Sequence, residues 1–171
     1  SVYGDTDVFP SKETDPISPL SPYAVQKLSA EQYCEVFRKS MGLQTASLRY
    51  FNVFGPRQST ADHSGVIARF VDSMKQNKAP VIFGTGDQTR DFVHVSDVVR
   101  ANLLALQCQQ EMLGLVVNIG TGKSTSLIKL VEYINKAQNT KIEPLFGPSA
   151  SGDTAHSCAS ISRAHSLFNY E

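Results

Sequence analysis

The chain has 171 residues, and its 16 Lys and Arg balance 16 Asp and Glu to give a formal net charge of zero at pH 7. A balanced charge provides no basic surface for a phosphodiester backbone, which argues against nucleic-acid binding. No run approaches the roughly 18 consecutive apolar residues that a bilayer span needs, so we expect no membrane association. Three widely spaced cysteines, Cys34, Cys108 and Cys158, favour reduced thiols in the cytoplasm over disulfides or a zinc site.

The first part of the chain predicts a helix followed by a strand. Val2-Tyr3-Gly4 is typical of a strand end that enters a turn, and residues 4–22 are expected to form a loop. Ser21 is a suitable N-cap for a helix that runs from about residue 22 to 40, and Gly42 is a suitable stop. The β-prone run at 45–51 then indicates a parallel α/β unit.

The rest of the chain continues this alternation of helices and strands. Ser124 is the expected N-cap of one of the later helices, and residues 144–160 are weakly patterned and expected to be a loop. Apolar periodicity predicts helices at about 66–74, 96–106, 127–138 and 161–168, and short apolar or extended runs predict strands at about 80–83, 91–95 and 116–119.

Tyr23 and Lys27 form an i, i+4 pair at the start of the first predicted helix, where their side chains can be neighbours. An ammonium group beside a phenol stabilises the phenolate, which lets the tyrosine exchange a proton with a substrate hydroxyl. A Tyr-Lys pair of this spacing is also a common solvated surface contact, so the pair needs support from its surroundings.

Five blocks of sequence supply that support: Val2-Tyr3-Gly4, 21–27 (SPYAVQK), 48–57 (LRYFNVFGPR), 84–97 (GTGDQTRDFVHVSD) and 118–122 (NIGTG). In order and spacing they resemble the extended short-chain dehydrogenase/reductase family of nucleotide-sugar epimerases and dehydratases. The resemblance implies an α/β fold, namely the later part of a Rossmann-type NAD(P)-binding domain with parallel strands and a small α/β substrate-binding domain. The implied division is 1–58 for the Rossmann-type part and 59–171 mainly for the substrate domain, with about 92–122 returning to the Rossmann-type part.

The resemblance also implies roles for individual residues. Tyr23 would be the catalytic acid/base, and Lys27 would hold the nicotinamide ribose of NAD and support the phenolate. Arg90 would clamp the diphosphate of a UDP-sugar, a task suited to a planar, permanently charged guanidinium, although a plain surface arginine is the alternative. Val66 and the 81–83 strand would enclose the nucleotide base, with apolar core as the alternative. The implied cofactor contacts are Tyr23, Lys27 and Tyr50, and the implied substrate contacts are Asn52, Val66, Ile82, Phe83, Arg90, Asp153 and Ser157.

The chain departs from the family pattern in two places. It contains no GxGxxG or GxxGxxG turn, which predicts a fragment that lacks the glycine-rich part of the cofactor domain and is inactive alone. Ala150 and Ala155 stand where relatives often carry arginines, which would weaken diphosphate binding.

A separate run, Gly120-Thr121-Gly122-Lys123-Ser124, resembles a phosphate-binding P-loop. Val117 occupies the position of the first glycine that a P-loop requires, so a strand-to-helix turn is favoured instead.

The predicted reaction is epimerisation at C4 of a UDP-sugar through a transient 4-keto intermediate. Ser1 occupies the place where dehydratases and decarboxylases of the family often carry an acidic residue, which favours the epimerase. By resemblance, Ser157 stands where a bulky Tyr restricts some 4-epimerases of the family to unsubstituted hexoses, so a serine there would leave room for an N-acetyl group and favours UDP-N-acetylglucosamine over UDP-glucose or UDP-glucuronate. The alternatives are a dehydratase, a decarboxylase, an NADPH-dependent reductase, or a non-catalytic remnant or sugar-nucleotide-binding module. The intact enzyme is expected to be a homodimer, by resemblance.

Overall fold

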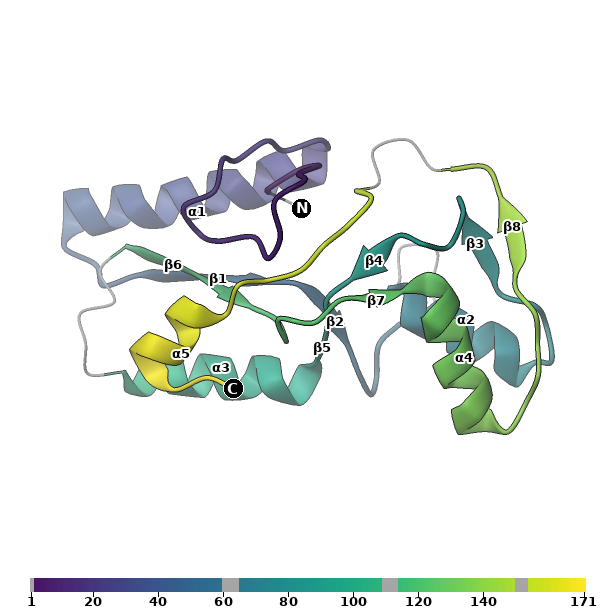
Figure 1. The fold of residues 1–171 in the computed structure, drawn as a ribbon. Coiled ribbons are helices and arrows are strands. Elements are labelled where there is room, and N and C mark those ends of the chain that lie inside the picture. The colour runs from purple at the N-terminus through teal and green to yellow at the C-terminus, as the bar shows by residue number, and fades with distance from the viewer. Residues whose placement is uncertain (1, 60–64, 109–113, 150–153) are drawn as a thin grey trace.

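The computed structural model describes residues 2–59, 65–108, 114–149 and 154–171, and it confirms the predicted α/β class with parallel strand pairs (Figure 1). Within these residues no helix is both long and apolar enough to cross a membrane. In chain order the elements are α1 (Pro22–Met41), β1 (Ala46–Tyr50), β2 (Asn52–Phe54), α2 (Val66–Lys75), β3 (Val81–Phe83), β4 (Thr89–Arg90), β5 (Phe92–His94), α3 (Val95–Gln107), β6 (Leu115–Ile119), β7 (Thr125–Ser126), α4 (Leu127–Gln138), β8 (Leu145–Gly147) and α5 (Ser162–Phe168).

Helix α1 begins and ends where its capping residues predict. The Ser21 hydroxyl accepts a hydrogen bond from the Ala24 N–H at 3.2 Å, and Pro22 occupies the first turn. At the other end Gly42 adopts a left-handed conformation with φ of 66°, and its N–H bonds the Arg38 carbonyl. Glycine adopts this conformation without the steric cost that a Cβ would add, so it ends the helix cleanly.

A parallel pair of strands, β1 and β6, forms the centre of one end of the molecule. Figure 1 shows α1 on one side of this pair and α3 with α5 on the other. Beyond Phe51 the chain continues into β2, which pairs in parallel with β5. The core between β6, α3 and α5 is apolar and consists of Ala101, Val117, Ile119, Ala164, Phe168 and Tyr170.

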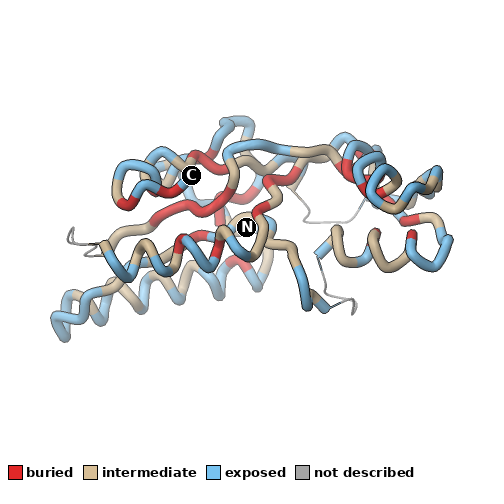
Figure 2. Tube along the Cα trace, turned by 90° about the horizontal axis from the view of Figure 1, so that it is seen from below, coloured by how far each residue is buried: buried red, intermediate tan, exposed pale blue. Residues whose placement is uncertain are grey.

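The other end of the molecule is built from α2, α4 and the parallel pair β3 and β8 (Figure 1). Helices α2 and α4 pack against each other around a second apolar cluster, formed by Phe70, Met74, Ile82, Leu127, Leu130, Val131 and Ile134. Figure 2 shows that the buried residues concentrate along the central strands and the helix faces that cover them. The described chain therefore has two apolar cores, joined by the strands that run between them.

Three local predictions are wrong. Ser126, not Ser124, caps α4, because β7 first pairs antiparallel with β4 and delays the helix start. Residues 145–147 are a strand rather than a loop, because β3 offers them a parallel edge. Val2 and Tyr3 lie in a turn, where Ser18 donates to the Val2 carbonyl, rather than at a strand end.

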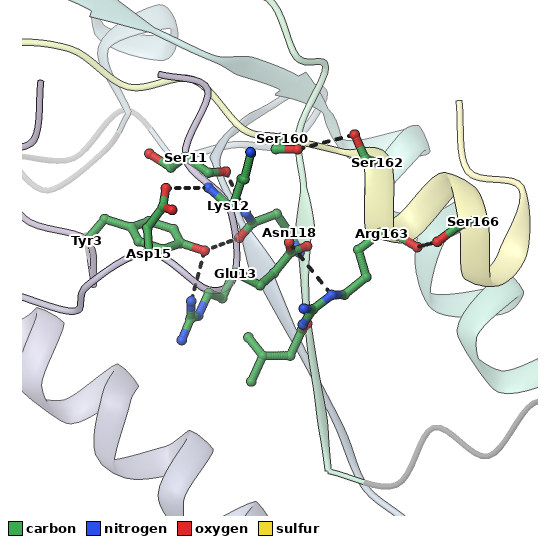
Figure 3. A network of polar contacts seen from close by, with 12 residues as sticks. Tyr3, Ser11, Lys12, Glu13, Asp15, Asn118, Ser160, Ser162, Arg163 and Ser166 are labelled. Atoms are coloured by element: carbon green, nitrogen blue, oxygen red, sulfur yellow. Dashed lines mark hydrogen bonds and ion pairs between the residues drawn. The ribbon is translucent and has the colours of Figure 1, made fainter. Parts of the chain in front are cut away.

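A polar network ties the N-terminal segment to β6 and α5 (Figure 3). The Tyr3 hydroxyl donates to Asn118 Oδ1 at 2.6 Å, and the Asn118 N–H donates to Glu13 Oε1 at 2.9 Å. Glu13 also pairs with Arg163 of α5, and the Asn118 amide donates to the Ser11 carbonyl. Because Asn118 is fully buried, each of its polar groups needs such a partner, and the network fixes the N-terminal segment.

Candidate active site

A pocket of about 670 Å³ lies beside α1 and along β1 and β2, and the start of α2 also lines it. The structure brings together in its lining six of the residues predicted for the site, which are Tyr23, Lys27, Tyr50, Asn52, Val66 and Ser157. These residues come from four separate segments of the chain. Their convergence on one cavity is therefore a result of the fold and not of sequence proximity.

The Tyr23 and Lys27 side chains lie next to each other at the start of α1. The Lys27 ammonium is 5.2 Å from the centroid of the Tyr23 ring, and Tyr23 is 59% exposed. Both residues line the pocket. A cation this close to an aromatic ring is favourably placed, and the phenol is open to a bound molecule.

A buried ion pair between Glu31 of α1 and Arg49 of β1 connects the helix to the strand, one helical turn after Lys27. Arg49 donates two hydrogen bonds to the Glu31 carboxylate, from Nε at 2.9 Å and from Nη2 at 2.8 Å. Its Nη1 also donates to the Tyr3 hydroxyl at 2.8 Å, and burial raises the pKa of that phenol despite the lowering effect of Arg49. Glu31 follows Lys27 by four residues on the same face of α1, so the pair holds the turn that adjoins the Tyr23 and Lys27 side chains.

Two strand residues of the pocket, Tyr50 and Asn52, make different kinds of hydrogen bond, one from its side chain and one from its backbone. Tyr50 lines the pocket, and its hydroxyl donates to Asn102 Oδ1 of α3 at 3.0 Å, which ties its side chain to α3. The Asn52 N–H donates to the Asp91 carbonyl at 3.0 Å, while the residue itself is exposed. The Asn52 side chain is thus presented on a backbone that β5 holds.

Three predicted substrate contacts do not line the pocket. Ile82 is fully buried in the apolar cluster between α2 and α4, and Phe83 beside it is 45% exposed. Arg90 is only 8% exposed, and its Nη1 donates to the carbonyls of Thr89 and Ala155. Their binding roles stay predictions. The expectations for Ser1, Ala150 and Asp153 lie outside the described residues.

Several pocket residues were not predicted as site residues, among them Tyr3, Glu31, Gln58 and Phe92. Glu31 had a detectable signal, since it extends the i, i+4 spacing of Tyr23 and Lys27 by one more turn. Phe92 and Gln58 had none, because their place in the pocket depends on the pairing of β2 with β5 and on the loop after β2.

The arrangement suits proton exchange with a polar ligand. An exposed phenol with a neighbouring ammonium can take and return a proton, and the amide of Asn52 and the hydroxyl of Ser157 can donate or accept hydrogen bonds. Apolar side chains such as Val66 and Phe92 supply the remaining wall. This mixture of a few polar groups with apolar surface is typical of small-molecule sites.

Comparison with known proteins gives consistent matches. A family model described as the NAD dependent epimerase/dehydratase family matches residues 1–120. A putative UDP-glucose 4-epimerase of Methanocaldococcus jannaschii is 41% identical over 98% of this chain and 53% of its own length.

Two solved structures are also similar. A UDP-N-acetylglucosamine 4-epimerase from Methanobrevibacter ruminantium, in complex with UDP-N-acetylmuramic acid, matches with a TM-score of 0.93 at 37% identity over 99% of this chain and 54% of that chain. A UDP-glucuronic acid 4-epimerase from Bacillus cereus, in complex with UDP-glucuronic acid and NAD, matches with a TM-score of 0.93 at 34% identity over 100% of this chain and 53% of that chain. The chain thus spans about half the length of these relatives.

Proposed function

Because the chain belongs to the NAD-dependent epimerase/dehydratase family, we propose that it carries the proton-transfer pair and the sugar-nucleotide side of a UDP-sugar 4-epimerase. The observation that carries this proposal is the exposed Tyr23 phenol beside the Lys27 ammonium in a pocket that Asn52 and Ser157 also line. The similarity to proteins named as 4-epimerases supports the choice of reaction within the family.

In the proposed reaction the Tyr23 oxygen removes the proton from the C4 hydroxyl as the C4 hydride leaves, and it later returns the proton to the same sugar oxygen after the ring has turned over. The Lys27 ammonium stabilises the phenolate that the first step requires. The 4-keto intermediate stays bonded to the charged diphosphate of UDP, and Asn52 and Ser157 can hydrogen-bond its neutral sugar ring while the ring turns over. One tyrosine therefore serves both halves of the reaction.

NAD is the proposed cofactor, and the residues present fit the part of it that this segment would hold. Lys27 is exposed and offers an ammonium for ribose hydroxyls, and Tyr50 also lines the pocket. When bound, NAD+ would accept the C4 hydrogen as a hydride and would return it to the opposite face of C4. No glycine-rich pyrophosphate turn occurs in these 171 residues, so we propose that they bind the sugar nucleotide without turning it over.

UDP-N-acetylglucosamine is the proposed substrate type. Ser157 is a small residue in the pocket lining, and a small side chain leaves space that a larger one would fill. The solved epimerase named for UDP-N-acetylglucosamine, at 37% identity, supports this choice. UDP-glucose and UDP-glucuronate are the competing substrates.

Calorimetric titration of the 171-residue chain with UDP-N-acetylglucosamine, UDP-glucose, UDP-glucuronate and NAD tests the proposal. We expect binding of UDP-N-acetylglucosamine, weaker binding of the other two sugars and none of NAD. Asn52→Ala should weaken the sugar-nucleotide binding about tenfold, because it removes a hydrogen-bonding side chain from the pocket. Gln138→Ala, far along α4, is the matched control and should bind as the unaltered chain does. No binding of any UDP-sugar would contradict the proposal and favour a non-catalytic remnant.

A further inference from the structure

Asp91 is a fully buried carboxylate between β4 and β5, and all of its hydrogen-bonding capacity is used. Its Oδ1 accepts from the Thr121 N–H at 2.8 Å and from the Thr121 hydroxyl at 2.7 Å. Its Oδ2 accepts from the Gly122 N–H at 3.1 Å and from the Ala159 N–H at 3.0 Å. An ionised carboxylate has about four acceptor positions, so these four neutral donors satisfy it.

The Asp91 carboxylate holds Thr121 and Gly122, which belong to the 120–124 run that resembles a P-loop in sequence. In a phosphate-binding turn, backbone N–H groups such as those of Thr121 and Gly122 point at a bound anion. Here the Asp91 carboxylate occupies that position. Gly120 makes the close approach possible, because a Cβ on it would lie 2.7 Å from both Asp91 Oδ2 and the Ala159 methyl.

The same residue connects two parts of the pocket wall. On one side the Asp91 carbonyl accepts from the Asn52 N–H at 3.0 Å, and the next residue, Phe92, lines the pocket. On the other side its carboxylate holds Ala159, two residues after Ser157, which also lines the pocket. The distance between Asn52 and Ser157 therefore depends on the Asp91 side chain.

Residues 155 and 156, just before Ser157, are also held, in this case by Thr89 of β4. The Thr89 N–H donates to the Ala155 carbonyl at 3.1 Å, and Thr89 Oγ1 lies 3.0 Å from His156 Nδ1. These bonds fix residues 155 and 156 beside β4, and Asp91 fixes residue 159 beside the start of β5. Ser157 lies between the two attachments, so its position is set from both sides.

We infer that Asp91 is a positioning residue that sets the width of the pocket between Asn52 and Ser157 and thereby favours a UDP-sugar over UDP alone. The inference rests on the proposed function, because it concerns the sugar nucleotide that the pocket is proposed to bind. Asp91 does not line the pocket, so it would control the fit of the sugar through the positions of Asn52 and Ser157.

Asp91→Asn is the first test variant. An asparagine has one acceptor oxygen instead of two, so at least one of the backbone N–H groups of Thr121, Gly122 and Ala159 loses its partner. Gly120→Ala is the second variant, and it forces Asp91 and Ala159 apart without removing the carboxylate. The two variants disturb the same junction by different means, so one of them serves if the other fails to fold.

Asn135→Ala is the matched control. Asn135 holds the turn after α4 through three hydrogen bonds with Thr140 and Ile142, and it does not line the pocket. Its loss should lower the melting temperature to a similar degree, because it also leaves backbone groups without partners. The control therefore separates a general loss of stability from a change in the pocket.

Calorimetric titration of each variant with UDP-N-acetylglucosamine and with UDP, below its melting temperature, decides the question. We expect Asp91→Asn and Gly120→Ala to weaken UDP-N-acetylglucosamine binding about tenfold and UDP binding much less, while Asn135→Ala changes neither. An unchanged ratio of the two affinities in both test variants, or an equal change in the control, would overturn the inference. If the unaltered chain binds neither ligand, the proposed function itself fails, and the inference fails with it.

Discussion

The Lys27 ammonium lies 5.2 Å from the centroid of the Tyr23 ring, one helical turn along α1. Both side chains are exposed and line the same pocket. The pocket therefore contains an exposed phenol with an ammonium group beside its ring, which is the arrangement that the proposed acid/base role of Tyr23 needs.

Tyr23→Phe should lower kcat by about 10²- to 10⁴-fold with little change in KM, because it removes the proton-transfer group and leaves the pocket. The measurement is 4-epimerase turnover by the full natural chain that carries these residues. Tyr33→Phe on the same helix is the control, since Tyr33 is exposed and does not line the pocket. Equal activity of Tyr23→Phe and the unaltered protein would rule out the assigned role.

Arg49→Met should lower the free energy of unfolding by about 3 kcal/mol, because it leaves the Glu31 carboxylate largely buried without its bidentate partner. Arg38→Met is the matched control on the more exposed Arg38–Glu35 pair, where the expected loss is much smaller because solvent screens the two charges. Urea unfolding measures both. Similar losses in the two variants would show that the Arg49–Glu31 pair does not anchor α1.

Alkaline pH should destabilise the chain through Tyr170. Burial, with the nearby Asp97 carboxylate, raises the pKa of this phenol from 10.0 to about 12, and its hydroxyl donates to the Gly120 carbonyl at 2.9 Å. The folded state therefore keeps the proton longer than the unfolded state, so this contribution is complete below pH 10 and is lost as the pH rises towards 12. The loss amounts to roughly 2–3 kcal/mol.

Urea unfolding across this pH range in the unaltered chain and in Tyr170→Phe checks the assignment. The variant should lose less stability between pH 10 and 12, although it is less stable at neutral pH. Tyr133→Phe, on an exposed side chain of α4, should follow the unaltered chain. A Tyr170→Phe curve that falls as steeply as the original would assign the alkaline loss to other groups.

Ile82→Ala separates a core role for this residue from a ligand contact. Because Ile82 is fully buried against α2 and α4, the variant should lose about 2–5 kcal/mol of stability. Phe83→Ala, at the more exposed neighbouring position, should lose about 1 kcal/mol or less. An Ile82→Ala chain with an unchanged melting temperature but weaker UDP-sugar binding would instead favour the nucleotide contact.

The sequence predicted the main elements because their signals are local. Ser21, Pro22 and Gly42 mark the ends of α1 by their own chemistry, and the apolar run at 116–119 reads as a buried strand without reference to any other segment. Tyr23 and Lys27 were also predictable, since their separation along a helix makes them neighbours wherever that helix lies.

What the sequence could not predict depends on pairing between distant segments. Strand β8 exists because β3 lies beside it, and Ser126 caps α4 because β4 holds the preceding residues. The buried bonds of Asp91 join residues 30, 31 and 68 positions apart, so no local pattern indicates them. The same holds for Arg49, whose partner Glu31 lies on another element.

The most direct measurement of the central claim is NMR analysis of the products that the full natural chain forms from UDP-N-acetylglucosamine and NAD in D₂O. We predict the sugar inverted at C4 with protium retained there, because the hydrogen removed from C4 returns to the same carbon. Tyr23→Phe should abolish this product. Release of water, deuterium at C4, or no inversion at all would contradict the assignment of a 4-epimerase.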